Sequence, residues 1–447
     1  MVSHPKSDYA VTWQAKVHNC TQERQGPMKN KVSMLLALVC LVATAASADN
    51  GAVLYSFCSQ TNCTDGAYPY AGLIFDHAYN LYGTTLQGGP VFAGTVFQLE
   101  HSSTGWKENV IYSFTGGSDG AAPAGPLVFD QTGNLYGIAG GGGSGFGTVY
   151  ELTPSNGSWS FHVIYTFLGG ADGVVGIDSG GLIIDQSGNL YGTTEMGGTA
   201  GFGTVFELTP SNGGWTKNTL YSFAGGNDAA DPLTGVTFDQ AGNLYGATVG
   251  GGAYGGGAVF ELTNSQNTWT ESVIYSFTGG NDGSYPEFGA VIFDSAGNLY
   301  GTAAGGGSYN QGVVYELTPS GDGWAESVLY TFTGGNDGGQ PFAGLTFNRA
   351  GNLFGEAAYY GASGYGTVFK LVREQGGWQE NTILTFDGNN GAFPYGAVVF
   401  DQSGNLFGAT FRGGNLSCNT INQGCGVAFE IASPNAVQGS LAKLAGR

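Results

Sequence analysis

Residues 181–223 read GLIIDQSGNLYGTTEMGGTAGFGTVFELTPSNGGWTKNTLYSF, and this stretch decides the fold. It contains four short runs rich in Val, Ile, Leu, Tyr, Phe and Thr, each bounded by Gly, Asn, Asp, Ser or Pro. Such runs are typical of β-strands joined by tight turns, and the segment Asp185–Asn189 suits a hairpin with a residue at positive φ. The stretch therefore predicts four antiparallel strands, which we name A to D in chain order.

The same unit recurs over residues 50–432. Its most constant part is the tetrad Asn-Leu-Tyr/Phe-Gly, which occurs seven times at an almost fixed spacing. The seven tetrads begin at Asn80, Asn134, Asn189, Asn243, Asn298, Asn352 and Asn405. A solenoid would have one or two strands in a much shorter period, whereas four antiparallel strands per period form one blade of a β-propeller. The sequence predicts an all-β, seven-bladed β-propeller.

The two ends of the repeat region predict how the ring closes. The region begins with a lone D strand at Val53–Phe57. It ends with strands A, B and C at Ala397–Asp401, Asn405–Thr410 and Gly426–Ile431. The N-terminal strand therefore supplies the missing D strand of blade seven, and this closure removes the exposed sheet edges of an open array.

Four cysteines lie near this closure. They are Cys58, Cys63, Cys418 and Cys425, and an even number in an exported chain indicates disulfides. The spacing leaves two alternatives open. The bonds are either local, joining Cys58 to Cys63 and Cys418 to Cys425, or they cross-link the two terminal segments.

The N-terminal residues predict export. Lys29 and Lys31 precede the apolar run 32–46, and Ala46-Ser47-Ala48 suits a signal peptidase. We expect residues 28–48 to be a signal peptide cleaved after Ala48, residues 1–27 to be a mis-annotated extension, residues 49–432 to be the propeller and residues 433–447 to be a short tail. The mature protein is then secreted or periplasmic.

The charge of the chain excludes one class of partner. There are 33 acidic and 13 basic residues, with a formal net charge of −20. Five of the basic residues precede residue 49, so the expected mature chain is more acidic still. An acidic surface repels phosphate backbones, so nucleic-acid binding is not expected. No later apolar run is long enough for a membrane span, and we expect a monomer.

The repeated pattern GNLYGTT…GG…GTVFELTP…W…VLYSFTGGNDG…P…AGLIFD resembles the GloVer (Gloeobacter/Verrucomicrobia) tandem-repeat family of exported bacterial proteins. The resemblance covers nearly all of residues 50–432. It implies an exported bacterial propeller and no particular activity. The A–B portion also resembles NHL-type propeller repeats, which supports the fold and not a function.

Loop positions that depart from the repeat are the candidate ligand-binding residues. The B–C and D–A loops are the longer ones, and both are expected on one face, opposite the A–B and C–D turns. The departures in the B–C loops are Glu195, Met196, Glu356, Tyr359, Tyr360, Phe411 and Arg412. Of these, Glu195, Glu356, Tyr359, Tyr360 and Arg412 suit a saccharide or peptide ligand. Neutral drift in exposed loops is the alternative explanation.

Two repeated residues have a structural and a functional interpretation. The D–A loops carry an acidic position at Asp65, Asp119, Asp172, Asp228, Asp282 and Asp337, with Asn390 in the seventh copy. Turn chemistry explains this position better than a calcium-binding ring does, because the loops lack the oxygen spacing of a calcium loop. The C–D turns carry a Trp at residues 106, 159, 215, 269, 324 and 378, which we interpret as a structural pin rather than a sugar platform.

Catalysis has little support in the sequence. His77, His101 and His162 fall in turns or in a strand, and none of them suggests a triad or a metal cluster. The favoured hypothesis is a non-enzymatic binding propeller for an extracellular glycan or protein, with no cofactor and no metal. The alternatives are a carbohydrate-active lyase or hydrolase that uses loop carboxylates, and a structural envelope or matrix protein.

Overall fold

The computed structural model describes residues 51–103, 105–177, 180–266, 268–321, 323–418 and 422–432. Within these ranges the chain forms β-strands and three short 3-10 helices, η1 (Thr61–Cys63), η2 (Gly170–Asp172) and η3 (Leu416–Cys418). The predicted extension, signal peptide and tail lie outside the described residues.

Seven four-stranded antiparallel sheets make up this region, and each follows the order A–B–C–D from its inner to its outer strand. Blades one to three comprise β3 (Ile74–Phe75), β4 (Leu81–Gln87), β5 (Thr95–Ser102) and β6 (Gly105–Ser113); β7 (Val128–Phe129), β8 (Leu135–Ala139), β9 (Thr148–Ser155) and β10 (Ser158–Thr166); and β11 (Ile183–Ile184), β12 (Leu190–Thr194), β13 (Thr204–Ser211) and β14 (Gly214–Ser222). Blades four and five comprise β16 (Thr237–Phe238), β17 (Leu244–Thr248), β19 (Ala258–Ser265) and β20 (Thr268–Ser276); and β21 (Ile292–Phe293), β22 (Leu299–Ala303), β23 (Val313–Ser320) and β24 (Gly323–Thr331). Blades six and seven comprise β25 (Thr346–Phe347), β26 (Leu353–Ala357), β27 (Thr367–Glu374) and β28 (Gly377–Thr385); and β29 (Val399–Phe400), β30 (Leu406–Thr410), β31 (Val427–Ile431) and β1 (Gly51–Ser56). The short strand β2 (Ala67–Pro69) pairs with β4, and β15 (Ala229–Ala230) pairs with β18 (Gly250–Gly251).

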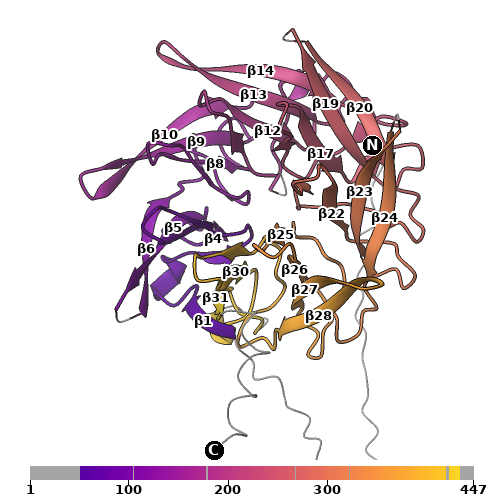
Figure 1. Cartoon of the computed structure of the whole chain (residues 1–447). Coiled ribbons are helices and arrows are strands. Elements are labelled where there is room, and N and C mark those ends of the chain that lie inside the picture. Colours follow the sequence, from indigo (N-terminus) through magenta and orange to yellow (C-terminus); the bar gives the residue numbers. More distant parts are fainter. Residues whose placement is uncertain are drawn as a thin grey trace, which may run out of the picture. The chain divides into compact units, whose positions relative to one another are not determined.

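The ring closes as the sequence predicts. Strand β1 pairs antiparallel with β31, with Gly51 opposite Ile431 and Ser56 opposite Val427. Figure 1 shows the indigo β1 beside the yellow β31, with the other blades following one another in chain order. The prediction of an all-β, seven-bladed propeller, with the N-terminal strand completing blade seven, is confirmed.

The disulfides resolve the alternatives that the sequence left open. Cys58 bonds to Cys63 and Cys418 bonds to Cys425, so both bonds are local and neither cross-links the terminal segments. The bonds nevertheless lie side by side at the closure, because the Sγ atoms of Cys58, Cys418 and Cys425 all lie within 4.8 Å of one another.

The A strands are shorter than predicted. The sequence indicates a strand over residues 71–76, but only Ile74–Phe75 pair with β4. The preceding residues lie against the neighbouring blade instead, since a Cβ on Gly72 would lie 2.5 Å from the carbonyl oxygen of Ala397. Glycine here allows the innermost segments of blades one and seven to approach closely.

Each residue of the repeated tetrad has a structural role, which blade three illustrates. The Asn189 backbone N–H and side-chain amide donate to the Asp185 carboxylate at 2.9 and 2.8 Å and so close the A–B turn. Leu190 is buried. The Tyr191 hydroxyl donates to Glu207 on β13 at 2.8 Å. The tetrad is therefore maintained by the blade itself and identifies no binding site.

The core is divided among the blade interfaces. The described residues form seven apolar clusters, and each contains side chains from two neighbouring blades. The C–D Trp side chains extend these clusters outward. Trp215 packs edge-to-face on Tyr136 of the preceding blade at 5.9 Å, and Trp324 packs on Tyr245 at 6.1 Å. The interpretation of the Trp residues as structural pins is confirmed at these interfaces.

Candidate functional site: the aromatic face of the B–C and D–A loops

The B–C loop of each blade lies beside the D–A loop that enters that blade. Val174 bridges to Met196 in blade three, and Ala392 bridges to Arg412 in blade seven. Further bridges of this kind occur in blades two, five and six. The two sets of loops therefore share one face, as predicted.

A cluster of eight aromatic rings covers part of this face, and we call it the aromatic mouth. Its rings come from blades five, six, seven and one, and neighbouring centroids are 5.2–6.4 Å apart. They belong to Tyr68, Tyr70, Phe288, Phe342, Tyr359, Phe393, Tyr395 and Phe411. The spacing is that of rings in edge-to-face and tilted contact. Residues more than 300 positions apart in the chain thus meet in one surface.

Tyr395 lies at the centre of the aromatic mouth. Its ring centroid is 5.2 Å from that of Tyr70 and 5.5 Å from that of Phe411, and its hydroxyl lies 2.9 Å from the Tyr359 hydroxyl. Burial, and then the neighbouring Tyr359, raise the pKa of Tyr395 well above its usual value. The phenol therefore stays protonated and can act as a hydrogen-bond donor but not as a base at neutral pH.

The aromatic mouth opens onto a central cavity of about 270 Å³ between the A strands. Tyr70, Phe288 and Tyr395 belong to both. The rest of the described cavity wall is backbone and aliphatic side chains, apart from the hydroxyl of Thr346. The described part of this wall carries no carboxyl side chain.

Two of the predicted ligand-binding residues belong to this site. Tyr359 is one of the eight rings, and the Arg412 guanidinium lies 5.8 Å from the Tyr68 ring centroid and 5.4 Å from that of Phe411. The Arg412 guanidinium also donates a hydrogen bond to Gln423. A cation held against two rings is fixed in orientation and still has further donors for a ligand.

Glu356 needs a correction. The sequence places it in the B–C loop of blade six, but it lies within strand β26, opposite Val368. Its side chain is fully buried and faces blade seven, since a Cβ on Gly408 would lie 3.0 Å from its Oε1. A residue without exposed surface cannot contact a ligand on this face, so we exclude Glu356 from the site.

The other predicted residues lie on the face but outside the aromatic mouth. Glu195 is partly exposed at the start of the B–C loop of blade three, two blades away from the mouth on either side. Tyr360 is 37% exposed and lies against Gly339 of the neighbouring D–A loop.

Tyr360 belongs to a second group of rings, whose other five members sequence reasoning missed. One strongly exposed aromatic residue projects from the B–C loop of each of blades one to six, and we call these the rim aromatics. They are Phe92, Phe146, Phe202, Tyr254, Tyr309 and Tyr360. Tyr254 and Tyr309 are the most open, at 68% and 60% exposure. The sequence does contain a signal for these residues, because each of them interrupts a Gly-rich segment. The position of the aromatic residue within the B–C loop shifts from blade to blade, however, so the residues do not align with one another.

The D–A loops combine a constant backbone with variable side chains. Six of them hold the residue before a proline at a φ of 52–62°. These residues are Tyr68, Ala122, Asp231, Tyr285, Gln340 and Phe393. Left-handed backbone is unfavourable for such residues, and the region before proline is normally extended. The blades thus repeat a strained turn and vary the side chain that it carries, which is a common feature of functional loops.

The repeated Asp residues stabilise turns. In the loop entering blade two, Asp119 accepts hydrogen bonds from the backbone N–H of Thr115 at 2.7 Å and from the Tyr112 hydroxyl at 2.9 Å. Because Tyr112 lies on strand D, the outermost strand of its blade, this carboxylate lies at the outer edge and not at the channel mouth.

A second hollow, of about 390 Å³, lies at the A–B and C–D turns of blades one and seven. His101, Trp106, Asp401 and Glu430 border it. Burial raises the pKa of Glu430 above its ordinary value, as does the nearby Asp401. The Asp401 carboxylate accepts from the Asn405 backbone and side-chain amide as part of the A–B turn, so this acid is already committed to a structural role.

These features define a seven-bladed β-propeller with the aromatic mouth, and most of the exposed aromatic side chains of its described residues, on the B–C/D–A face. The model of the Gloeobacter/Verrucomicrobia repeat matches residues 40–180, 175–289 and 267–446, and the chain belongs to this family. No curated protein matches the sequence. The part of the chain that the structure describes contains no helix long and apolar enough to cross a membrane.

Solved propellers resemble the chain at low sequence identity. A Thermus thermophilus protein described as an oxidoreductase (glucose dehydrogenase) is 16% identical with a TM-score of 0.42, over 69% of this chain and 95% of its own. A Bacteroides fragilis protein described as a 6-phosphogluconolactonase is 11% identical with a TM-score of 0.46, over 74% of this chain and 93% of its own. At these scores the likeness carries no argument about activity.

Proposed function

We propose that this protein is an exported, monomeric and non-enzymatic carbohydrate-binding propeller that holds a neutral glycan on its B–C/D–A face. The observation that carries the proposal is the distribution of aromatic side chains. Seven of the eight strongly exposed aromatic residues in the described ranges lie in these loops, and the eighth, Tyr79, lies in an A–B turn on the opposite face. Exposed apolar groups gathered on one face mark an interaction surface.

The chemistry of this face suits a sugar. Flat aromatic rings contact the apolar C–H faces of a pyranose, while phenol hydroxyls and a guanidinium bond to its hydroxyl groups. Tyr395, Tyr359 and Arg412 offer these polar groups inside the aromatic mouth. The rim aromatics recur with the blades, so a glycan polymer can contact several of them at once and gain avidity without any one strong site.

A protein partner is less favoured by the rim aromatics. Protein interfaces need a contiguous buried centre, whereas the rim aromatics project one from each blade and are separated by Gly-rich loop. A hydrolase or lyase acting at the central cavity would need a pair of carboxyl groups there. The described cavity wall offers Tyr70, Thr346 and Tyr395 as its polar side chains.

The proposal is tested by affinity electrophoresis of the purified protein in gels that contain neutral polysaccharides, combined with a glycan array. The doubly substituted variant Tyr254→Ala/Tyr309→Ala removes the two most exposed rim rings. At about 1 kcal/mol for each stacked ring, we expect its affinity to fall roughly tenfold to thirtyfold. Tyr79→Ala is the matched control, because it removes an exposed tyrosine from the opposite face.

Unchanged retention of the double variant, or a loss in Tyr79→Ala of the same size, contradicts the proposed face. Shortened polysaccharide chains after incubation with the wild-type protein would favour the enzyme alternative instead. Export is tested separately, by N-terminal sequencing of the protein from its native host, for which we expect a first residue at position 49.

A further inference from the structure

A repeated slot lies between neighbouring blades at their outer edges. On one side are a Tyr of strand D and the Asp of the following D–A loop. On the other side is the residue two positions after the Trp on strand D of the next blade. Between blades two and three these residues are Tyr165, Asp172 and Lys217, which we use to define the interblade slot.

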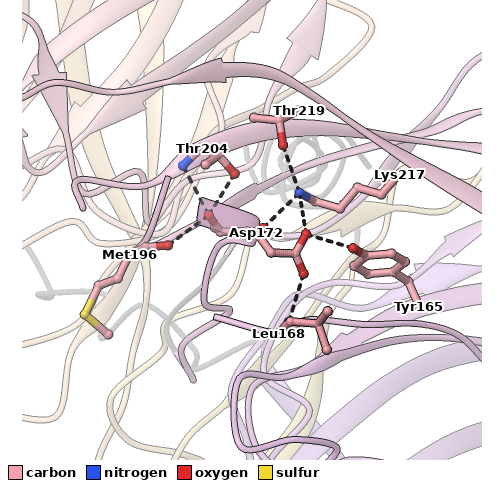
Figure 2. A network of polar contacts seen from close by, with 8 residues as sticks. Tyr165, Leu168, Asp172, Met196, Thr204, Lys217 and Thr219 are labelled. Carbon is pink, nitrogen blue, oxygen red and sulfur yellow. Dashed lines mark hydrogen bonds and ion pairs between the residues drawn. The ribbon is translucent and has the colours of Figure 1, made fainter. Parts of the chain in front are cut away.

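Between blades two and three the slot holds a positive charge. The Lys217 ammonium nitrogen lies 3.1 Å from Asp172 Oδ1, 2.8 Å from the Asp172 carbonyl oxygen and 3.0 Å from the Thr219 hydroxyl, as Figure 2 shows. It also lies 5.7–6.0 Å from the ring centroids of Tyr165, Phe167 and Phe206. The Lys217 side chain is only 5% exposed. A carboxylate, a carbonyl, a hydroxyl and aromatic faces together favour a cation.

At four other interfaces a glutamate stands in the place of Lys217. The acidic pairs across these slots are Asp65–Glu108, Asp228–Glu271, Asp282–Glu326 and Asp337–Glu380. The Asp keeps its turn role in each, for example through the Tyr221 hydroxyl that donates to Asp228 at 3.0 Å. The slot is therefore preserved, but the positive charge that fills it between blades two and three is replaced by a second carboxyl group.

The Asp65–Glu108 slot is the most buried of the four. Asp65 has no exposed surface and Glu108 has 9%. The Asp65 carboxylate accepts from the Tyr55 hydroxyl at 2.8 Å and from the Ser59 backbone N–H at 2.8 Å. Glu108 Oε1 is buried and has no hydrogen-bond partner among the described residues. The adjacent Lys107 is exposed at the surface.

We propose that the Asp65–Glu108 slot binds a calcium ion, and that the other three acidic slots are weaker copies of the same site. The ion takes the place that the Lys217 ammonium occupies between blades two and three. Carboxylate and carbonyl oxygens are ligands of hard divalent cations, and calcium tolerates an irregular set that water completes, whereas magnesium demands near-ideal octahedral geometry. The repeated Asp was visible in the sequence. The acidic pair was not, because the Glu that faces each Asp lies on the next blade.

A proton is the competing occupant of these slots. Burial, and then the charge of Asp65, raise the pKa of Glu108 to about 8, so without a metal this carboxyl group is protonated at neutral pH. Calcium binding then displaces the proton. The two occupants differ in what they predict, because a calcium ion makes the stability depend on calcium concentration and a proton alone does not.

The test is equilibrium dialysis of the full-length protein with calcium at a pH near 8.5, where the competing proton is largely lost, together with thermal unfolding with and without about 5 mM calcium. That concentration lies above the millimolar dissociation constants of weak extracellular sites. We expect calcium to bind and to raise the unfolding midpoint by several degrees. In Glu108→Gln the tightest site disappears and the shift becomes smaller. Glu374→Gln, at an exposed position, is the matched control.

A second variant tests the proposal without weakening an existing slot. Lys217→Glu recreates the acidic pair opposite Asp172, so we expect it to bind one more calcium ion than the wild-type protein. The proposal is overturned if no calcium binds, if Glu108→Gln binds as the wild type does, or if Lys217→Glu gains no ion. If the thermal unfolding midpoint depends on pH and not on calcium, the slots hold protons and the calcium proposal is overturned.

Discussion

Glu356 shows how one residue can depart from the repeat without serving the binding face. The aligned residues in blades three and five are Thr193 and Thr302, whose hydroxyls donate to the carbonyl oxygens of Thr234 and Ala343 in the next blade, both at 2.9 Å. Neither carboxyl oxygen of Glu356 has a hydrogen-bond partner among the described residues. Burial raises its pKa well above the ordinary value, so the group is a neutral acid with its polar atoms unsatisfied.

We predict that Glu356→Thr stabilises the protein by about 1 kcal/mol, because it removes a buried unsatisfied carboxyl group and restores the hydroxyl used in blades three and five. Chemical denaturation at pH 7 measures the change. Glycan binding should be unaffected, since the side chain has no exposed surface. A variant that is less stable than the wild type, or that loses glycan binding, would show that Glu356 has a partner or a role that the fold does not reveal.

Sequence reasoning misplaced Glu356 for a physical reason. Strand B ends in small residues, and the B–C loop begins with small residues, so composition alone does not fix the boundary between them. Tyr359 and Arg412 were found because their side chains are unusual for such a loop. Other rings of the aromatic mouth, such as Tyr70, Phe288 and Tyr395, were missed, since each occupies an ordinary position of its own repeat and becomes part of a site only when the ring closes.

At the scale of the element, the D strands supply ionisable side chains to the blade interfaces. Burial, and then the facing Asp, raise the pKa of Glu271 and of Glu326 to about 7. Burial raises that of Glu380 to about 7, partly offset by a hydrogen bond from Thr382. Between blades two and three, Lys217 forms an ion pair with Asp172 instead. Two carboxyl groups therefore face each other across four interfaces, where burial favours the protonated form of the glutamate, and an ion pair spans one.

We predict that the protein becomes less stable as the pH rises from 6 to 9 in the presence of a chelator. The folded pKa values of these glutamates lie above the ordinary 4.5, so folding binds protons. Their contribution to stability is complete below 4.5 and is lost as the pH rises through about 7 to 8. Thermal unfolding at each pH should show the midpoint falling by several degrees.

The variant that carries Gln at positions 108, 271, 326 and 380 is the control for this prediction. Its midpoint should change much less over the same pH range, because the side chains no longer titrate. An equally steep fall in this variant would assign the pH dependence to other groups.

The strands themselves were largely predictable because packing requires the same residue types at the same positions of every blade. The tetrad places Leu in the core and Asn in the turn of every blade, so seven copies of one pattern specify seven copies of one structure. The A strands are shorter than predicted because the innermost segments of neighbouring blades approach each other closely at the ring axis. The contact of Gly72 with blade seven is an example, and it cannot be read from the sequence of a single repeat. Apart from Tyr360, the rim aromatics were not predicted, because the length of the loop varies between blades and these residues therefore do not align.

At the scale of the whole molecule, the ring depends on one closure that the continuous chain does not provide. Strand β1 completes blade seven, and the apolar cluster between blades seven and one contains Phe57 from the N-terminal segment and Phe407 from the C-terminal one. The two disulfides stiffen the loops beside this closure but leave the terminal segments unlinked. Among the described residues, opening of the ring at β1 is therefore limited by strand pairing, packing and hydrogen bonds, such as that from the Tyr68 N–H to the Cys425 carbonyl, and not by a covalent bond between the two segments.

We predict that the doubly substituted variant Cys63→Ser/Cys418→Ser forms a disulfide between Cys58 and Cys425, which would join the two terminal segments covalently. Both local bonds are lost, and the Sγ atoms of Cys58 and Cys425 that remain lie within 4.8 Å of each other. Their disulfide would enclose nearly the whole propeller, and the chain-entropy relation gives a stabilisation of about 5–6 kcal/mol over the reduced form of the same variant for a loop of several hundred residues. Mass spectrometry of tryptic peptides identifies the bond, and denaturant unfolding of the oxidised and reduced forms measures the gain. Free thiols after oxidation, or equal unfolding midpoints for the two forms, would show that the terminal segments do not meet as the closed ring requires.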